Sequence, residues 1–130
     1  MSKKLFILTL IGLISATSAY AKCDGGTEIT NSIGTTFCQS HVSLNWWSAA
    51  SWCKANGMHL ASMYEMCPSW DGTEGDNKCP ELTGRCENFA ISSTAYGQTD
   101  FCRVRCSNGE VRCDMYRHDV PSDDFALCKE

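Results

Sequence analysis

Ten cysteines are the residues of this chain most able to do chemistry, and they allow three kinds: thiol–disulfide exchange, zinc binding and disulfide bonding. Exchange favours a Cys-x-x-Cys pair with a lowered thiol pKa, and the sequence has no such pair. Structural zinc favours closely spaced cysteine pairs, and Cys102 and Cys106 have a usable gap. The even count instead favours five disulfides with no free thiol, formed by Cys23, Cys38, Cys53, Cys67, Cys79, Cys86, Cys102, Cys106, Cys113 and Cys128.

Residues Met1–Ala21 have the pattern of a secretory signal peptide. Lys3 and Lys4 precede an apolar run from Leu5 to Ile14, and Ala19-Tyr20-Ala21 has the form of a cleavage site. The apolar run is too short to span a membrane. We therefore expect a secreted or periplasmic protein, cleaved near Ala21 and not inserted in a membrane, in a compartment where disulfides persist.

Cleavage leaves residues 22–130, enough for a single domain. Lys3 and Lys4 are lost with the signal, so the net charge of the mature chain is −6 with histidine neutral. An acidic chain without a basic block does not suit nucleic acid or an anionic membrane. We expect neither as a partner.

The segment from Cys67 to Pro80 reads as a long loop with a cysteine near each end. Its oxygen-bearing side chains could ligate Ca²⁺, which binds several oxygens at once, and they are Asp71, Glu74, Asp76 and Asn77. Their spacing is not that of an EF-hand. A solvated acidic loop is the simpler interpretation, and no cofactor is expected.

No catalytic motif is recognisable. There is no nucleophile elbow and no His-Glu-x-x-His, and His41, His59 and His118 are scattered along the chain. Glu65 is better explained as part of a helix cap than as a general acid. We expect a protein that is not an enzyme.

One amphipathic helix organises the first half of the domain. A single helical face is formed by Trp46, Ala49, Ala50 and Cys53. Ser43 or Asn45 can cap its start, and Asn56-Gly57 can end it. Ser62 and Glu65 have the spacing of a capping box, which predicts a second short helix immediately afterwards.

Strands are expected before and after these helices. Cys23–Ile29 and Thr35–Cys38 read as a hairpin that a Cys23–Cys38 bridge would close. Asn88–Ser93 reads as a strand, Ala95–Gln98 as a turn, and Phe101–Cys106 as the next strand.

Asn108-Gly109 predicts a type I′ hairpin that places Ser107 opposite Glu110. That pairing assigns one face to Cys102, Val104, Cys106, Val111, Cys113 and Met115. The opposite, wet face holds Arg103, Arg105, Arg112 and Asp114. The inward cysteines are expected to reach Cys67, Cys79 or Cys86.

A tryptophan-rich helix ending in Trp52-Cys53, followed by Gly57-x-x-Leu60-Ala61-Ser62, resembles the first helix and turn of C-type lectin-like domains. The end of the chain, Phe125–Glu130, resembles the last strand of that family. The resemblance implies an α+β fold with two short helices and a small, mainly antiparallel sheet. It also implies a Cys53–Cys128 bridge and the Cys23–Cys38 bridge of long-form members, while three further bridges are expected to staple the central loops.

The triplets that carry calcium-dependent sugar binding in this family are absent: the sequence contains no Glu-Pro-Asn, Gln-Pro-Asp or Trp-Asn-Asp. The nearest late segment, Val120–Asp124, lacks the pattern. We therefore expect exported, non-enzymatic recognition of an extracellular protein or glycan without calcium. A cysteine-stabilised toxin or defence polypeptide is the alternative.

Candidate contact residues are loop aromatic and cationic side chains, where binding energy usually concentrates. They are Trp70, Tyr96, Arg117 and His118. Trp70 has an alternative role, since it could simply plug the stapled acidic loop onto the domain.

Overall fold

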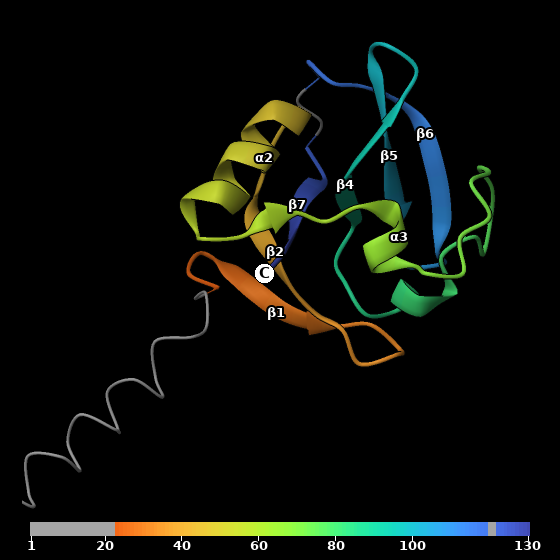
Figure 1. Cartoon of the computed structure of the whole chain (residues 1–130), viewed down its shortest axis with the longest axis horizontal. Helices are drawn as coiled ribbons and strands as arrows, with labels where there is room; N and C mark the ends of the chain where they lie inside the picture. Colours follow the sequence, from red (N-terminus) through yellow and green to blue (C-terminus); the bar gives the residue numbers. More distant parts are fainter. Residues whose placement is uncertain (1–22, 120–121) are drawn as a thin grey trace, which may run out of the picture.

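The computed structural model describes residues 23–119 and 122–130, so the predicted signal peptide and its predicted cleavage site lie outside the described residues. The described part is an α+β fold with a mostly sheet core (Figure 1). Its helical elements are α2 (Trp46–Ala55), α3 (Met63–Met66) and a 3₁₀ turn, η2 (Pro80–Leu82). Its strands are β1 (Gly26–Thr30), β2 (Thr36–Ser43), β3 (His59–Leu60), β4 (Phe89–Tyr96), β5 (Asp100–Arg105), β6 (Glu110–Tyr116) and β7 (Asp124–Lys129).

The described strands form a single sheet in the order β1-β2-β7-β4-β5-β6, with β3 also paired to β7. Every pair is antiparallel except β4 with β7, which is parallel. The prediction of a mainly antiparallel sheet is therefore confirmed. The last strand lies in the middle of the sheet, between the N-terminal hairpin and the β4–β6 meander.

Both predicted helices form, and local caps explain where they begin. Asn45 is the N-cap of α2: its side-chain Oδ1 accepts a hydrogen bond of 2.8 Å from the Ser48 N–H. Ser62 and Glu65 form the predicted capping box at the start of α3. Gly57 has a φ of 75°, the left-handed conformation expected just after a helix end.

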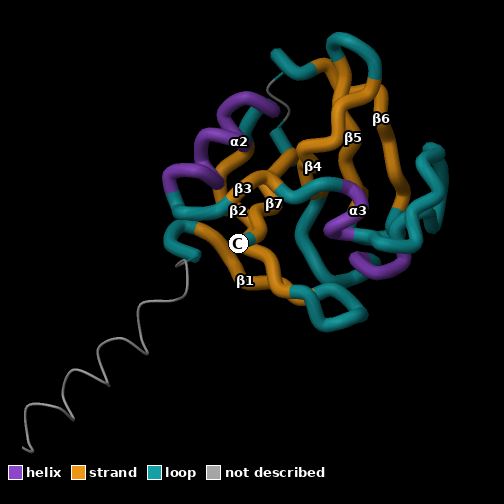
Figure 2. Tube along the Cα trace, viewed as in Figure 1, coloured by secondary structure: helices purple, strands orange, loops and turns teal. Residues whose placement is uncertain are grey.

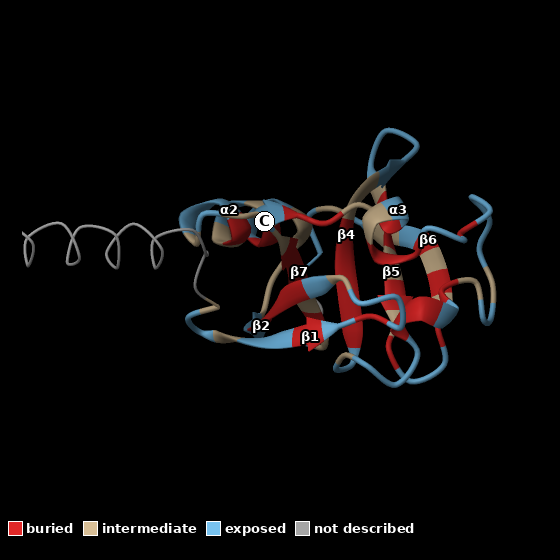
Figure 3. Ribbon diagram, turned by 60° about the horizontal axis from the view of Figure 1, so that its bottom comes forward, coloured by how far each residue is buried: buried red, intermediate tan, exposed pale blue. Residues whose placement is uncertain are grey.

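Buried side chains form two groups, one beneath α2 and one near α3. The α2 group contains Ala49, Cys53, Ile91, Phe101 and Cys128. Figure 2 shows the two helices well apart, and Figure 3 shows that the central strands are buried while the connecting loops are exposed. A chain this short buries limited apolar area, so cross-links matter for its stability.

Five disulfides connect the described cysteines, and none of these cysteines is free. Cys23–Cys38 closes the N-terminal hairpin and Cys53–Cys128 joins α2 to β7, as predicted. The other bridges are Cys67–Cys79, Cys86–Cys106 and Cys102–Cys113.

The expectation that all inward cysteines of β5 and β6 reach Cys67, Cys79 or Cys86 is wrong for two of them. Only Cys106 does so, while Cys102 and Cys113 bond to each other across the two strands. A bulge between Phe101 and Arg103 explains the pairing, because it brings these cysteines together on adjacent strands.

The predicted register of the β5–β6 hairpin is also wrong. Arg105, not Ser107, lies opposite Glu110. Asn108 lacks the positive φ that a type I′ turn needs, so the connection is a longer turn in which the Gly109 N–H donates to the Arg105 carbonyl. The inward and outward faces were nevertheless predicted correctly, because a two-residue shift preserves the alternation of side chains.

The turn predicted at Ala95–Gln98 begins later than expected, because β4 continues through Tyr96. Gly97, with a φ of 66°, then starts the turn into β5.

The acidic loop covers part of the outer edge of β6. The Gly75 and Val111 backbones exchange two hydrogen bonds of 3.0 and 2.9 Å. The Glu74 carboxylate accepts a further bond of 2.6 Å from the Cys113 N–H. Unpaired strand edges attract other chains, so this loop satisfies backbone groups that would otherwise be open.

Candidate functional site

Three of the four predicted contact residues, Tyr96, Arg117 and His118, lie at one end of the molecule. Tyr96, Asp100 and Tyr116 are neighbours in the strand register across β4, β5 and β6. In Figure 1 this end is at the top of the view, where the β4–β5 hairpin and the segment after β6 lie near the start of α2. We name it the aromatic surface and define it by Trp46, Trp47, Tyr96, Tyr116, Arg117 and His118.

Arg117 holds this end together. Its guanidinium carbon lies 4.8 Å from the centre of the Trp46 ring, and its Nε and Nη2 donate to the carbonyls of Asp100 and Gly97 at 3.2 and 3.4 Å. Trp46 is itself anchored, since its indole N–H donates to the Ser92 carbonyl at 3.0 Å. Arg117 therefore ties α2 to the β4–β5 hairpin and positions the rings around it.

The remaining rings are open to solvent. Trp47, Tyr96 and Tyr116 are 49%, 50% and 43% exposed. His118 lies between two of them, with its ring centre 6.3 Å from that of Trp47 and 5.2 Å from that of Tyr116. The arrangement is a row of exposed rings on a stapled scaffold.

Trp46, Trp47 and Tyr116 were not among the predicted contact residues. A signal for Trp47 was nevertheless present, because Trp46 lies on the inward helical face. The next residue of a helix is turned by about 100° from its neighbour, so Trp47 had to face away from the core. Tyr116 gave no such signal, because its partners depend on the strand register.

Trp70 lies elsewhere and is not part of the aromatic surface. It is 7% exposed, its indole N–H donates to the Thr73 carbonyl at 2.8 Å, and its ring lies 5.1 Å from that of Tyr64. This geometry matches the alternative that Trp70 plugs the stapled loop onto the domain.

Two candidate calcium ligands of the acidic loop are already bonded within the protein. Asp71 accepts hydrogen bonds from Thr73 and from Lys78 Nζ, the latter at 2.9 Å. These contacts, chiefly the Thr73 hydroxyl, lower the pKa of Asp71 to about 2. Glu74 bonds to Cys113 as described above. Among the described residues, no group of three His, Cys, Asp or Glu is placed to hold a metal ion.

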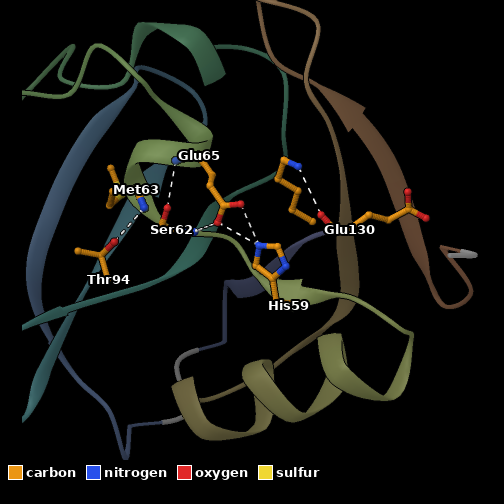
Figure 4. Close-up of polar contacts among 7 residues, drawn as sticks. His59, Ser62, Met63, Glu65, Thr94 and Glu130 are labelled. Carbon is orange, nitrogen blue, oxygen red and sulfur yellow. Dashed lines mark hydrogen bonds and ion pairs between the residues drawn. The ribbon is translucent and has the colours of Figure 1, made fainter. Parts of the chain in front are cut away.

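His59 and Glu65 form a second polar cluster, at the start of α3 (Figure 4). Glu65 accepts from the Ser62 N–H at 2.9 Å and contacts the His59 Nε2 at the same distance. Burial raises the pKa of Glu65, but the contacts from Ser62 and His59 outweigh it and leave that pKa lowered. The Met63 N–H next to this cap donates to Thr94 Oγ1. The cluster is a helix cap tied to β4, which agrees with the structural role expected for Glu65.

A shallow groove of about 380 Å³ leads away from the aromatic surface along α2. It lies between this helix and the β3–β4 region, and it is lined by Trp46, Ala50, Lys54, Met58, His59, Leu60 and Ser93. Trp46 therefore borders both the groove and the row of exposed rings, so a partner on that row could extend along the helix.

Within the residues that the structure describes, no helix is long and apolar enough to cross a membrane. Comparison with family models, curated proteins and solved structures gave no match.

Proposed function

We propose that this protein is an exported, non-enzymatic recognition module with a C-type lectin-like fold. It binds an extracellular protein or glycan, without calcium, through the aromatic surface. The observation that carries the proposal is the row formed by Trp47, His118 and Tyr116, exposed and side by side. Exposed Trp and Tyr on a rigid support are the side chains that most often dominate binding energy.

The covalent framework supports the fold part of the proposal. Cys53–Cys128 joins the first long helix to the last strand, and Cys23–Cys38 closes the N-terminal hairpin. In addition, β2 pairs with β7, so segments near both ends of the domain are neighbours in the sheet. The two bridges are the ones that the resemblance leads us to expect of a long-form member.

The rigidity of the surface supports the recognition part. Arg117 holds the β4–β5 hairpin against α2 through three contacts, and the Cys102–Cys113 bridge joins β5 to β6, the strand that precedes Arg117. Rings that are already ordered lose little conformational entropy on binding. Such a surface can therefore bind a partner with few contacts.

The test is a screen of the mature protein against extracellular proteins and glycans, with and without a chelator. Trp47→Ala/Tyr116→Ala is compared with Tyr64→Ala, whose ring is also exposed but lies beside Trp70. We expect a ligand whose binding survives chelation and weakens at least about tenfold in the double variant only. Binding that needs calcium, or that both variants weaken equally, would contradict the proposal.

A further inference from the structure

Resting on the proposed function, we infer that the aromatic surface binds a cation: a lysine or arginine side chain presented by a partner protein. The site is the row of Trp47, His118 and Tyr116, together with Asp119, the acidic residue that follows His118 in the chain.

The first argument is the ring faces themselves. The face of an aromatic ring is electron-rich and attracts ammonium and guanidinium groups, most strongly for Trp. The protein already uses this attraction once, because the Arg117 guanidinium lies 4.8 Å above the Trp46 ring. The neighbouring Trp47 and Tyr116 rings are about half exposed, so they remain open to a cation from outside.

The second argument is the charge around the rings. Asp119 directly follows His118, and its carboxylate has no hydrogen bond or ion pair among the described residues. By contrast, four cationic side chains elsewhere form ion pairs with carboxylates of this chain, namely Lys78, Arg103, Arg105 and Arg112. The aromatic surface itself contributes the guanidinium of Arg117, which is held over the Trp46 ring.

The mature chain also carries a net charge of −6, which favours encounter with a basic partner over an acidic one. An anionic group at the rings would approach the Asp119 carboxylate, while the Arg117 guanidinium is already engaged with Trp46 and with backbone carbonyls. Of the partners that the aromatic surface could take, a basic segment of a protein fits both the rings and the charge.

The experiment measures fluorescence anisotropy of a short labelled peptide with lysines spaced by Gly-Ser, titrated with the mature protein. The same peptide with acetylated lysines and one with glutamates are the ligand controls. Trp47→Ala and Asp119→Asn test the site, and Tyr64→Ala is the matched aromatic control. Circular dichroism verifies that each variant is folded.

We expect the lysine peptide to bind more tightly than its acetylated form, and Trp47→Ala to weaken it about fivefold. Asp119→Asn should weaken it less, and less again at higher salt. Tyr64→Ala should leave the affinity unchanged.

Equal binding of the lysine and acetyl-lysine peptides would overturn the inference, as would an affinity that Trp47→Ala leaves intact. The latter result would mean non-specific attraction to an acidic chain. If Trp47→Ala/Tyr116→Ala still abolishes binding of a ligand found in the screen while lysine peptides fail to compete, the inference falls and the proposed recognition function stands.

Discussion

Removing the Asp124 carboxylate is expected to destabilise the fold by about 3–5 kcal/mol, because it leaves the mostly buried Arg103 cation without its partner. Asp124 begins β7 with its side chain fully buried, and it forms an ion pair with Arg103, whose side chain is 11% exposed. The Arg103 guanidinium carbon also lies 3.8 Å from the centre of the Phe89 ring. Among the described residues, Arg103 Nε has no hydrogen-bond partner. The guanidinium therefore has no second acceptor at this nitrogen that could replace the carboxylate.

The ion pair itself is not expected to be the source of this stability. Burial raises the pKa of Asp124, while the attraction and hydrogen bond of Arg103 oppose that shift. The pKa of Asp124 stays raised, so the pairing with Arg103 does not fully offset the cost of desolvation, as is common for buried ion pairs. Arg103→Met/Asp124→Leu, which removes both charges and keeps the volume filled, should recover most of the loss, less the roughly 0.5–2 kcal/mol of the contact with Phe89.

Urea unfolding of the oxidised protein measures these differences through the free energy of unfolding. Asp119→Ala, at an exposed carboxylate, is the control and should stay within about 0.5 kcal/mol of the wild type. The reasoning is refuted if Asp124→Ala costs less than about 1 kcal/mol, or if the double variant is no more stable than Asp124→Ala.

Three further predictions follow from local contacts. Asn45→Ala should lower the free energy of unfolding in urea by about 1 kcal/mol, because the Ser48 N–H loses its cap, whereas Asn45→Asp should not; equal losses would argue against capping. Cys53→Ser/Cys128→Ser opens a loop of 75 residues and should cost about 4 kcal/mol, visible as a fall in Tm; an unchanged Tm would contradict this. By NMR titration, Asp71 should ionise near pH 2, so the stability that it contributes is present above its unfolded pKa of 3.8 and is lost as the pH falls towards 2; a midpoint near 3.8 would refute the contacts with Thr73 and Lys78.

The sequence by itself determined the parts of this protein that depend on neighbouring residues. Three local patterns formed as predicted: the helical face from Trp46 to Cys53, the Asn56-Gly57 stop, and the capping box at Ser62. The alternation along β5 and β6 likewise assigned the side chains to the two faces correctly, but Arg103, expected to face water, is mostly buried beside Asp124. Such patterns can be recognised in the sequence because the backbone geometry of a helix or strand repeats every few residues.

The tertiary structure decided what depends on pairing distant segments. The Cys102–Cys113 bridge depends on a bulge in β5, and the register of the β5–β6 hairpin depends on a turn in which Asn108 lacks a positive φ. Trp70, expected as a candidate contact, became a buried plug.

The aromatic surface also belongs to this second class. Arg117 and His118 were predicted as contacts, but their partners Trp46 and Trp47 lie some seventy residues earlier in the chain. They meet because β7 places α2 against the same sheet that carries β4 and β5. A local sequence pattern does not show which distant segments will be neighbours in the fold. The position of a strand within a sheet depends on the packing of the whole domain rather than on its own residues.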